Sequence, residues 1–242
     1  MLFRSLSGGG VAAVGTGALA KFTSRTEAWA DGATLQVGAL DVIADHDSHM
    51  FLSAGAVALG GAAFAGTFAV GLDNSVTKAH VEGGSVDAPG AITVQAASDT
   101  ELRNIGVSGA GAGGAAVAGM AVVALIGNTT QAYVADARVG SVATPSGSLQ
   151  VKATDIVAVD NKAGAAAGGG SAGIGLGAGV TKIANTVSAY VVDSDVDVAG
   201  DLTVDALAQR DLFTFAATAG VSAGFSLAGA AGVTIVGSTL SD

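Results

Sequence analysis

Two short stretches of the sequence contain residue types that could do chemistry. The segment DHDSH at residues 45–49 carries imidazole and carboxylate groups, which can bind zinc or serve a hydrolase. Farther on, Asp193, Asp195 and Asp197 stand at alternate positions, so on a strand they would share one face and could offer oxygens to calcium. Neither stretch has the spacing of an EF-hand or of a repeated calcium-binding turn. We therefore expect a polar turn and a solvated acidic face, with calcium as the weak alternative and no other metal.

Aromatic rings form the third candidate, because four of them occupy one position of a long repeat. Each ring follows a small residue, and the residue two positions before it is polar, which places the ring on the outward face of a strand. Stacked strands would then align the rings into an exposed aromatic ladder. Such a ladder either stabilises the sheet or forms an adhesive surface for sugars or a neighbouring fibre. The rings are Trp29, His80, Tyr133 and Tyr190.

The repeat that must position these residues is marked by the motif Gly-x-(Leu/Ile)-x-Val-x-Ala. It occurs at residues 38–44, 90–96, 147–153 and 200–206, so successive copies begin between 52 and 57 residues apart. A fixed long period is typical of repeat architectures, in which each unit buries its apolar face against its neighbours. We divide the chain into repeats 1–52, 53–105, 106–160, 161–213 and a partial 214–242. They form one array, which we expect to be a fragment of a longer chain.

The composition favours a fold of thin, closely stacked sheets. Half of the residues are apolar, but only 5% are aromatic, and there are 38 glycines. Small side chains suit close packing between sheets better than a thick core. The sequence therefore predicts an all-β fold, a parallel β-solenoid (β-helix) of Gly/Ala/Val-rich repeats with one wide, flattened coil per repeat. Glycine pairs such as Gly60-Gly61 are expected to make turns, and the polar segment from Asp45 a corner.

Two sets of equivalent residues are expected to form structural ladders between repeats. Asparagine can adopt a left-handed backbone at a corner or stack as an amide ladder. The glycine that opens each Gly-x-(Leu/Ile)-x-Val-x-Ala strand turns the chain into that strand. The two sets are Asn74, Asn128 and Asn185, and Gly38, Gly90, Gly147 and Gly200.

Charge excludes one class of partner. The net charge is −10, seventeen of the twenty acidic residues are Asp, and Lys and Arg form no cluster that could hold phosphates, so no nucleic-acid partner is expected. Cysteine is absent, which excludes disulfides and thiolate chemistry.

Two apolar segments invite a membrane or targeting interpretation. The stretch 109–127 has no charge and is long enough to span a bilayer, but it is only weakly hydrophobic and recurs along the chain, so we expect no membrane span. The opening residues resemble a signal peptide, yet they align with residues 60–81, which favours a repeat unit.

The pattern resembles the repeats of very large secreted proteins of the leukotoxin and filamentous-haemagglutinin-like adhesin group. The matching stretches are Asn128–Val134 with Gly147–Ala153, and Asn185–Val191 with Gly200–Ala206. The resemblance implies a fibre exported to the bacterial cell surface, often by type V secretion, that acts in adhesion or biofilm structure. It implies a structural or adhesive stalk, with no enzymatic activity and no cofactor.

Expected partners are adjacent repeats, other copies of the same protein and cell-surface glycans. The alternatives are the passenger region of a leukotoxin-like cytotoxin and, less favoured, a solenoid enzyme acting on polysaccharides.

Overall fold

The computed structural model describes residues 2–237 and 239–241, with side chains from residue 9 to residue 237. Its regular elements are all strands, joined by short turns and bends, as the composition predicts. Among the described residues, no helix has the length and hydropathy needed to cross a membrane. Residues 109–126 of the uncharged stretch instead belong to two successive strands and the glycine turn between them.

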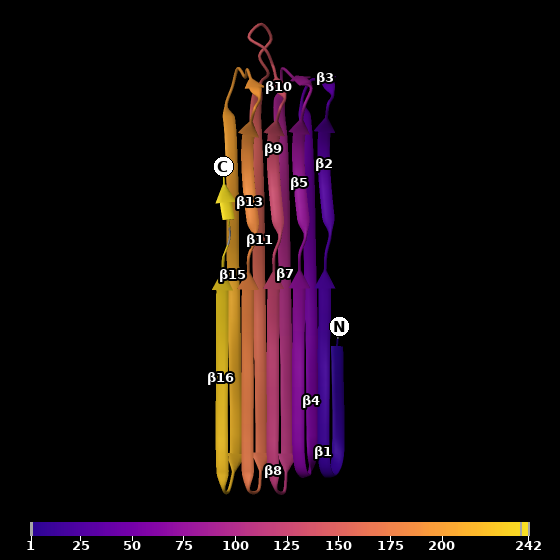
Figure 1. Cartoon of the computed structure of the whole chain (residues 1–242), viewed down its shortest axis with the longest axis vertical. Coiled ribbons are helices and arrows are strands. Elements are labelled where there is room, and N and C mark those ends of the chain that lie inside the picture. Colours follow the sequence, from indigo (N-terminus) through magenta and orange to yellow (C-terminus); the bar gives the residue numbers. More distant parts are fainter. Residues whose placement is uncertain (1, 238, 242) are drawn as a thin grey trace.

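The largest sheet has eight strands and is parallel throughout (Figure 1). Its hydrogen-bonded order is β15-β11-β7-β4-β8-β12-β16, and β1 pairs with β4 beside this path. The strands are β1 (Leu2–Phe22), β4 (Leu40–Asp73), β7 (Ala91–Ala112), β8 (Ala115–Ile126), β11 (Ser148–Gly169), β12 (Ala172–Ile183), β15 (Leu202–Ser222) and β16 (Phe225–Val236).

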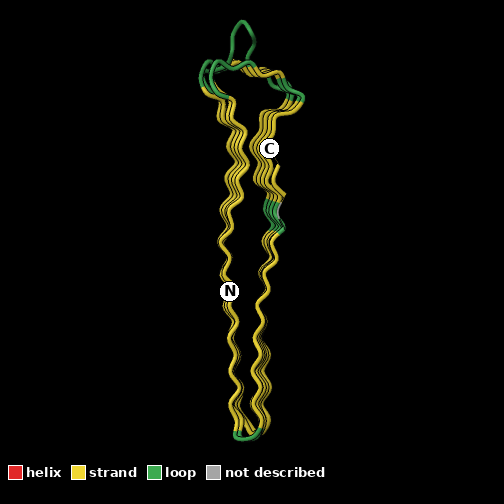
Figure 2. The backbone as a smooth tube through the Cα atoms, turned by 90° about the vertical axis from the view of Figure 1, so that its left-hand side faces the viewer, coloured by secondary structure: helices red, strands yellow, loops and turns green. Residues whose placement is uncertain are grey.

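The arrangement of these strands corrects the predicted fold class. β4 runs for 34 residues and belongs to both long walls, so the sheet folds back on itself instead of dividing into faces separated by corners (Figure 2). The two ends of the path, β15 and β16, are consecutive in the chain and contact each other. The result is a strongly flattened, nearly closed parallel barrel of seven strands. The prediction of a parallel β-solenoid with one wide coil per repeat is wrong.

The polar segment at residues 45–49 shows why that prediction failed. It was expected to be a corner, but it lies inside the uninterrupted strand β4. Its residues alternate between buried and exposed. Alternation is what a strand with one buried and one wet face requires, and polarity alone does not interrupt it.

Two smaller parallel sheets form the wider end of the molecule. One has the order β17-β13-β9-β5-β2, and the other has the order β14-β10-β6-β3. Their strands are β2 (Arg25–Asp31), β3 (Thr34–Gln36), β5 (Val76–Glu82), β6 (Ser85–Asp87), β9 (Thr129–Ala135), β10 (Arg138–Val139), β13 (Thr186–Val192), β14 (Asp195–Val196) and β17 (Thr239–Ser241).

Equivalent residues of successive repeats are hydrogen-bonding neighbours. In the Gly-x-(Leu/Ile)-x-Val-x-Ala strands, Leu40 pairs with Ile92, Ile92 with Leu149, and Leu149 with Leu202. Like therefore lies beside like along the sheet. The strands at the two sides of the molecule, called end strands below, are β1, β2 and β3 on one side and β14, β15, β16 and β17 on the other.

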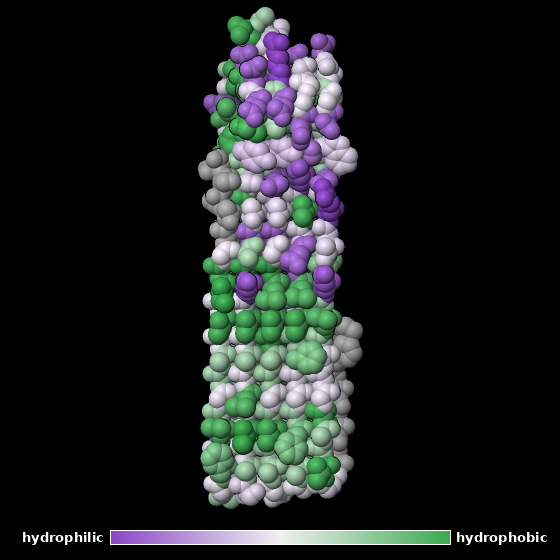
Figure 3. All heavy atoms as spheres, in the orientation of Figure 1, coloured by the Kyte–Doolittle hydropathy of each residue, from purple (hydrophilic) through white to green (hydrophobic). Residues whose placement is uncertain are grey.

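The molecule is polarised along its strands. Segments 9–20, 53–72, 105–126, 163–181 and 212–236 contain no Asp, Glu, Lys, Arg or His. They form the end with the glycine-rich turns, called the charge-free half below, and the remainder is called the charged half. On the face shown in Figure 3, hydrophobic residues cover the lower part and hydrophilic residues gather in the upper part.

Candidate interaction surfaces

The residues of the DHDSH segment do not form one site, because β4 directs them to opposite faces. His46 points inward, is 7% exposed, and its Nδ1 lies 3.2 Å from the Ser24 hydroxyl. His49 points outward, where its Nε2 lies 3.0 Å from an Asp47 carboxylate oxygen and its Nδ1 3.1 Å from one of Glu101. The two imidazoles therefore cannot act on one substrate or hold one ion.

His49 begins a band of ion pairs that crosses the outer face of β4, β7 and β11. Arg103 lies between two carboxylates, with nitrogen–oxygen distances of 3.8 Å to Glu101 and 3.4 Å to Asp160. Lys162 lies 2.6 Å from Asp160. The side chains alternate in charge from strand to strand because their positions pair in register.

Part of this band lines a groove of about 460 Å³. Phe213 on β15 closes one side, and the Lys162 ammonium lies 5.4 Å from the centre of its ring. Such a surface offers charged hydrogen-bonding groups beside an aromatic face, which suits a polar organic ligand. The lining residues are Glu101, Arg103, Ala158, Val159, Asp160, Lys162, Asp211 and Phe213.

Sequence reasoning missed this groove because its members come from three different repeats. No short motif contains Arg103, Asp160 and Phe213, which lie in register on adjacent strands. An alignment of the repeats could have found the groove, because it places the outward residues of successive copies side by side. Using that alignment requires the exact register, because the third copy of the motif begins 57 residues after the second, whereas the other copies begin 52 and 53 residues apart.

The aromatic residues predicted as a ladder lie on β2, β5, β9 and β13, in register. The ring centres of His80 and Tyr133 are 4.8 Å apart, and those of Tyr133 and Tyr190 are 5.0 Å apart with nearly parallel planes. Trp29 is 62% exposed, but Tyr133 is only 5% exposed. The prediction of an exposed ladder is therefore wrong for Tyr133, because its neighbours cover both faces of its ring.

Polar contacts further fix the middle of this ladder. The Tyr133 hydroxyl donates a hydrogen bond of 2.8 Å to Glu82, and the Lys78 ammonium lies 4.6 Å from the Tyr133 ring centre. Burial, followed by the bond to Glu82, raises the pKa of Tyr133. Burial and the nearby Lys78 lower the pKa of His80. Both effects favour neutral rings, which stack without charge repulsion.

The three aspartates considered for calcium are placed by turn geometry. Asp193 has a φ of 48°, in the left-handed region, as do its equivalents Asp136 and Gly83. Asp and Gly tolerate this conformation better than most residues. Asp195 begins β14, and the Asp197 carbonyl accepts a hydrogen bond from Ser146. Among the described residues, no group of three or more acidic, histidine or cysteine side chains is arranged to hold a metal ion.

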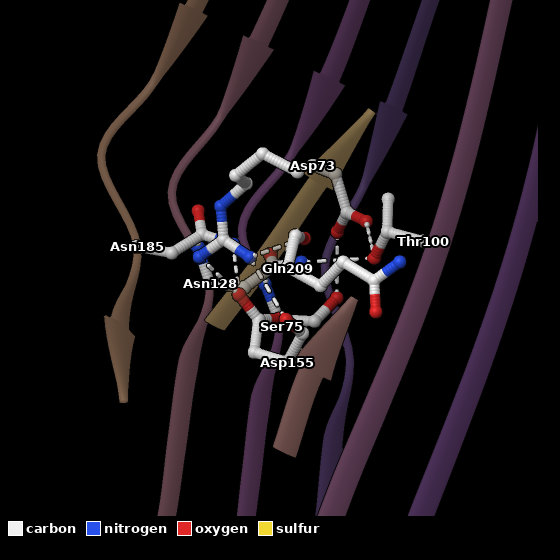
Figure 4. A network of polar contacts seen from close by, with 8 residues as sticks. Asp73, Ser75, Thr100, Asn128, Asp155, Asn185 and Gln209 are labelled. Atoms are coloured by element: carbon white, nitrogen blue, oxygen red, sulfur yellow. Dashed lines mark hydrogen bonds and ion pairs between the residues drawn. The ribbon is translucent and has the colours of Figure 1, made fainter. Parts of the chain in front are cut away.

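Two of the three ladder asparagines join a buried polar network between the walls (Figure 4). The side-chain oxygen of Asn128 accepts a hydrogen bond of 2.8 Å from the Ser75 backbone N–H. The backbone N–H of Asn128 donates a hydrogen bond of 3.0 Å to the side-chain oxygen of Asn185. The Asn128 amide also donates to the Thr100 hydroxyl at 3.0 Å. Asn74 is exposed.

The carboxylates at the two ends of this network are fully buried. Asp73 accepts bonds from the Ser75 hydroxyl at 2.7 Å and the Thr100 hydroxyl at 3.3 Å. The Asp155 carboxylate accepts a hydrogen bond of 2.7 Å from the Asn185 side-chain amide. It also forms an ion pair with Arg210 at a nitrogen–oxygen distance of 2.7 Å. Burial raises the pKa of Asp155, although the Asn185 bond and the Arg210 charge oppose that effect. The network holds the walls together at the level of the Asn residues.

The four ladder glycines are linked by backbone hydrogen bonds. Gly90 N–H donates to Gly38, Gly147 to Gly90, and Gly200 to Gly147, at 2.8, 3.2 and 2.6 Å. A Cβ added at Gly90 would lie 2.4 Å from the Gly38 carbonyl oxygen, which is closer than real Cβ contacts. Glycine is therefore required here by close backbone approach.

Comparison with protein-family models, with curated proteins and with solved structures finds no match to this chain.

Proposed function

We propose that this chain is a structural and adhesive segment of an exported, cell-surface fibre, and that it associates with further copies of itself through its end strands. The resemblance of its repeats to secreted adhesins supports the extracellular location. The proposed partners are other copies of the protein and, at the outer band, cell-surface glycans. The segment acts by binding and holding, without catalysis or a cofactor.

The unpaired edges of the end strands are the observation that carries this proposal. β15 and β16 pair with one neighbour each, and so do β14 and β17. Unpaired strand edges are templates for pairing with another chain. The inward side chains of β15, such as Val204, are only partly buried because no further strand among the described residues covers them, whereas the equivalent Val94 and Val151 are fully buried. A further parallel strand would bury both the backbone edge and these side chains.

A charge placed on the inward face of an end strand tests the proposal. In Val204→Lys, an added strand would have to bury an ammonium group, which natural end strands use to prevent pairing. We expect electron microscopy and sedimentation velocity to show chains of copies for the natural sequence. Val204→Lys should weaken that association about tenfold or more.

Thr203→Lys is the matched control, because it adds the same charge to the outward face of the same strand. Circular dichroism must show strand content unchanged in both variants. Equal loss of association in both would mean that net charge, and not edge pairing, governs assembly. A natural chain that stays monomeric at every concentration would contradict the proposal.

A further inference from the structure

The charge-free half has its large side chains outside and its small ones inside. The buried residues between its walls are mostly alanine, including Ala56, Ala65 and Ala118. On the outer face of the wall formed by β1, β4, β8, β12 and β16, Phe64, Phe68 and Leu176 are 46%, 52% and 46% exposed. An exposed apolar surface of this extent marks an interaction site.

A row of glycines crosses this outer face. Gly15, Gly66 and Gly119 pair in register, and Gly229 continues the row beyond Leu176. A Cβ added at Gly15, Gly66 or Gly119 would meet nothing within 4 Å. Nothing within the described chain therefore requires glycine at these positions, and glycine inside a strand costs roughly 0.5–1 kcal/mol relative to alanine.

The glycine row forms the floor of a shallow groove. One part, of about 470 Å³, is lined by Gly15, Gly66 and Gly119 together with Phe64 and Val117. A second part, of about 400 Å³, lies beside Leu176 and Gly229. Glycine within a strand often marks the close approach of another backbone or ligand. Rings next to a glycine groove are a shape that a copy of the same surface can match.

We propose that this glycine-grooved outer face is an interface that pairs with the same face of a second copy of the chain. A two-fold axis that lies in the interface plane and crosses the strands at the level of Met120 carries Phe68 of each copy over the glycine row of the other. The pairing is self-complementary and closes at two copies. It is independent of the end-strand association, which is open-ended.

The size and charge of the face fit this occupant. Five strands about 4.8 Å apart, each about ten residues long at about 3.3 Å per residue, give a face of about 800 Å². Two such faces bury about 1,600 Å², which is the standard size of a stable interface. Because the segments behind the face carry no charged residue, the net charge of −10 is held away from it. Lipid fits less well, because unpaired edges of β1 and β16 would enter hydrocarbon without hydrogen-bond partners.

The test fills the groove without disturbing the fold. In Gly119→Leu the new side chain meets open space, and the next strand already carries Leu176 at the equivalent position. The control is Gly168→Leu, on the opposite wall, which is also open and whose equivalents on adjacent strands include Val221. We expect both variants to keep the natural strand content and to be at least as resistant to denaturant.

Pairing is measured by sedimentation equilibrium in the Val204→Lys background, which removes end-strand growth. Gly119→Leu should weaken dimer formation about tenfold or more, and Gly168→Leu should leave it unchanged. Where the natural chain forms filaments, Gly119→Leu should reduce their width and keep their length, whereas Val204→Lys shortens them. Filament width therefore tests this proposal, and filament length tests the proposed function, so failure of one can be told from failure of the other.

Cysteine cross-linking provides a second measurement, because the natural chain has no cysteine. Ala121→Cys lies on the outer face of the central strand β8, and a bifunctional thiol-reactive reagent should join two copies there, whereas Val107→Cys on the opposite wall should not cross-link. Equal dimerisation of the two Leu variants, or no cross-link at residue 121, would overturn the proposal. So would a natural chain that stays monomeric in buffer but binds phosphatidylcholine vesicles, since lipid would then be the occupant.

Discussion

The charged and charge-free halves share one pairing scheme but are held together by different forces. In the charged half, Asp73, Asn128 and Asp155 lie between the walls and make directional hydrogen bonds. In the charge-free half, alanines such as Ala58 and Ala116 fill the space between the walls by close contact. The comparison shows that strand register does not dictate the chemistry of the interior.

The largest effect is expected from cutting the polar network in the charged half. Asn128→Ala leaves the Ser75 backbone N–H without its acceptor and the Thr100 hydroxyl without its donor, both in a buried setting. Each unsatisfied buried group costs about 1–3 kcal/mol, so the free energy of unfolding should fall by about 2–4 kcal/mol. Denaturant titration followed by circular dichroism measures it.

Gln131→Ala is the control for this prediction. Gln131 lies on β9, close to Asn128 in the chain, but points outward and is partly exposed. Its substitution should change the free energy of unfolding by less than about 0.5 kcal/mol. Comparable losses in the two variants would mean that the network does not distinguish the charged half.

An intermediate effect is expected from overfilling the charge-free half. Ala118→Val adds two methyl groups to a fully buried position between closely packed walls. Overpacking of this kind costs about 1–3 kcal/mol. Ala166→Val, on the outward face of β11, should be nearly neutral in the same denaturant titration. If Ala118→Val were neutral too, the interior of this half would not be close-packed.

The sequence predicted the strands and their pairing better than it predicted the shape. The recurring Gly-x-(Leu/Ile)-x-Val-x-Ala motif defines the register in which Leu149 lies beside Leu202. In the same motif, the Gly90 N–H donates to the Gly38 carbonyl and the Gly147 N–H donates to the Gly90 carbonyl. Both follow from local patterns that repeat along the chain.

The predicted corner at residues 45–49 and the exposed position of Tyr133 were wrong for reasons that local patterns do not contain. Whether a polar stretch turns or continues depends on what faces it across the interior, as His46 facing Ser24 shows. Whether an outward ring is exposed depends on its neighbours in other repeats. The groove beside Arg103 likewise requires three repeats to be aligned exactly. Long-range register, and not residue preference, decides all three.

The smallest expected effect concerns the pH dependence of the buried Asp155 carboxylate. Because burial raises its folded-state pKa above the unfolded value, its contribution to stability is fully present below the unfolded pKa and is lost as pH rises through the folded pKa. The Asn185 bond and the Arg210 charge offset part of the burial effect, so the change should be modest.

Asp155→Asn cannot titrate and keeps a similar shape. Between about pH 4 and pH 7, the natural chain should therefore lose stability relative to Asp155→Asn as pH rises. Denaturant titrations at several pH values measure this difference, with Asp205→Asn as a control for removing one exposed charge. A relative gain in stability of the natural chain with rising pH would show that the pairing with Arg210 outweighs burial.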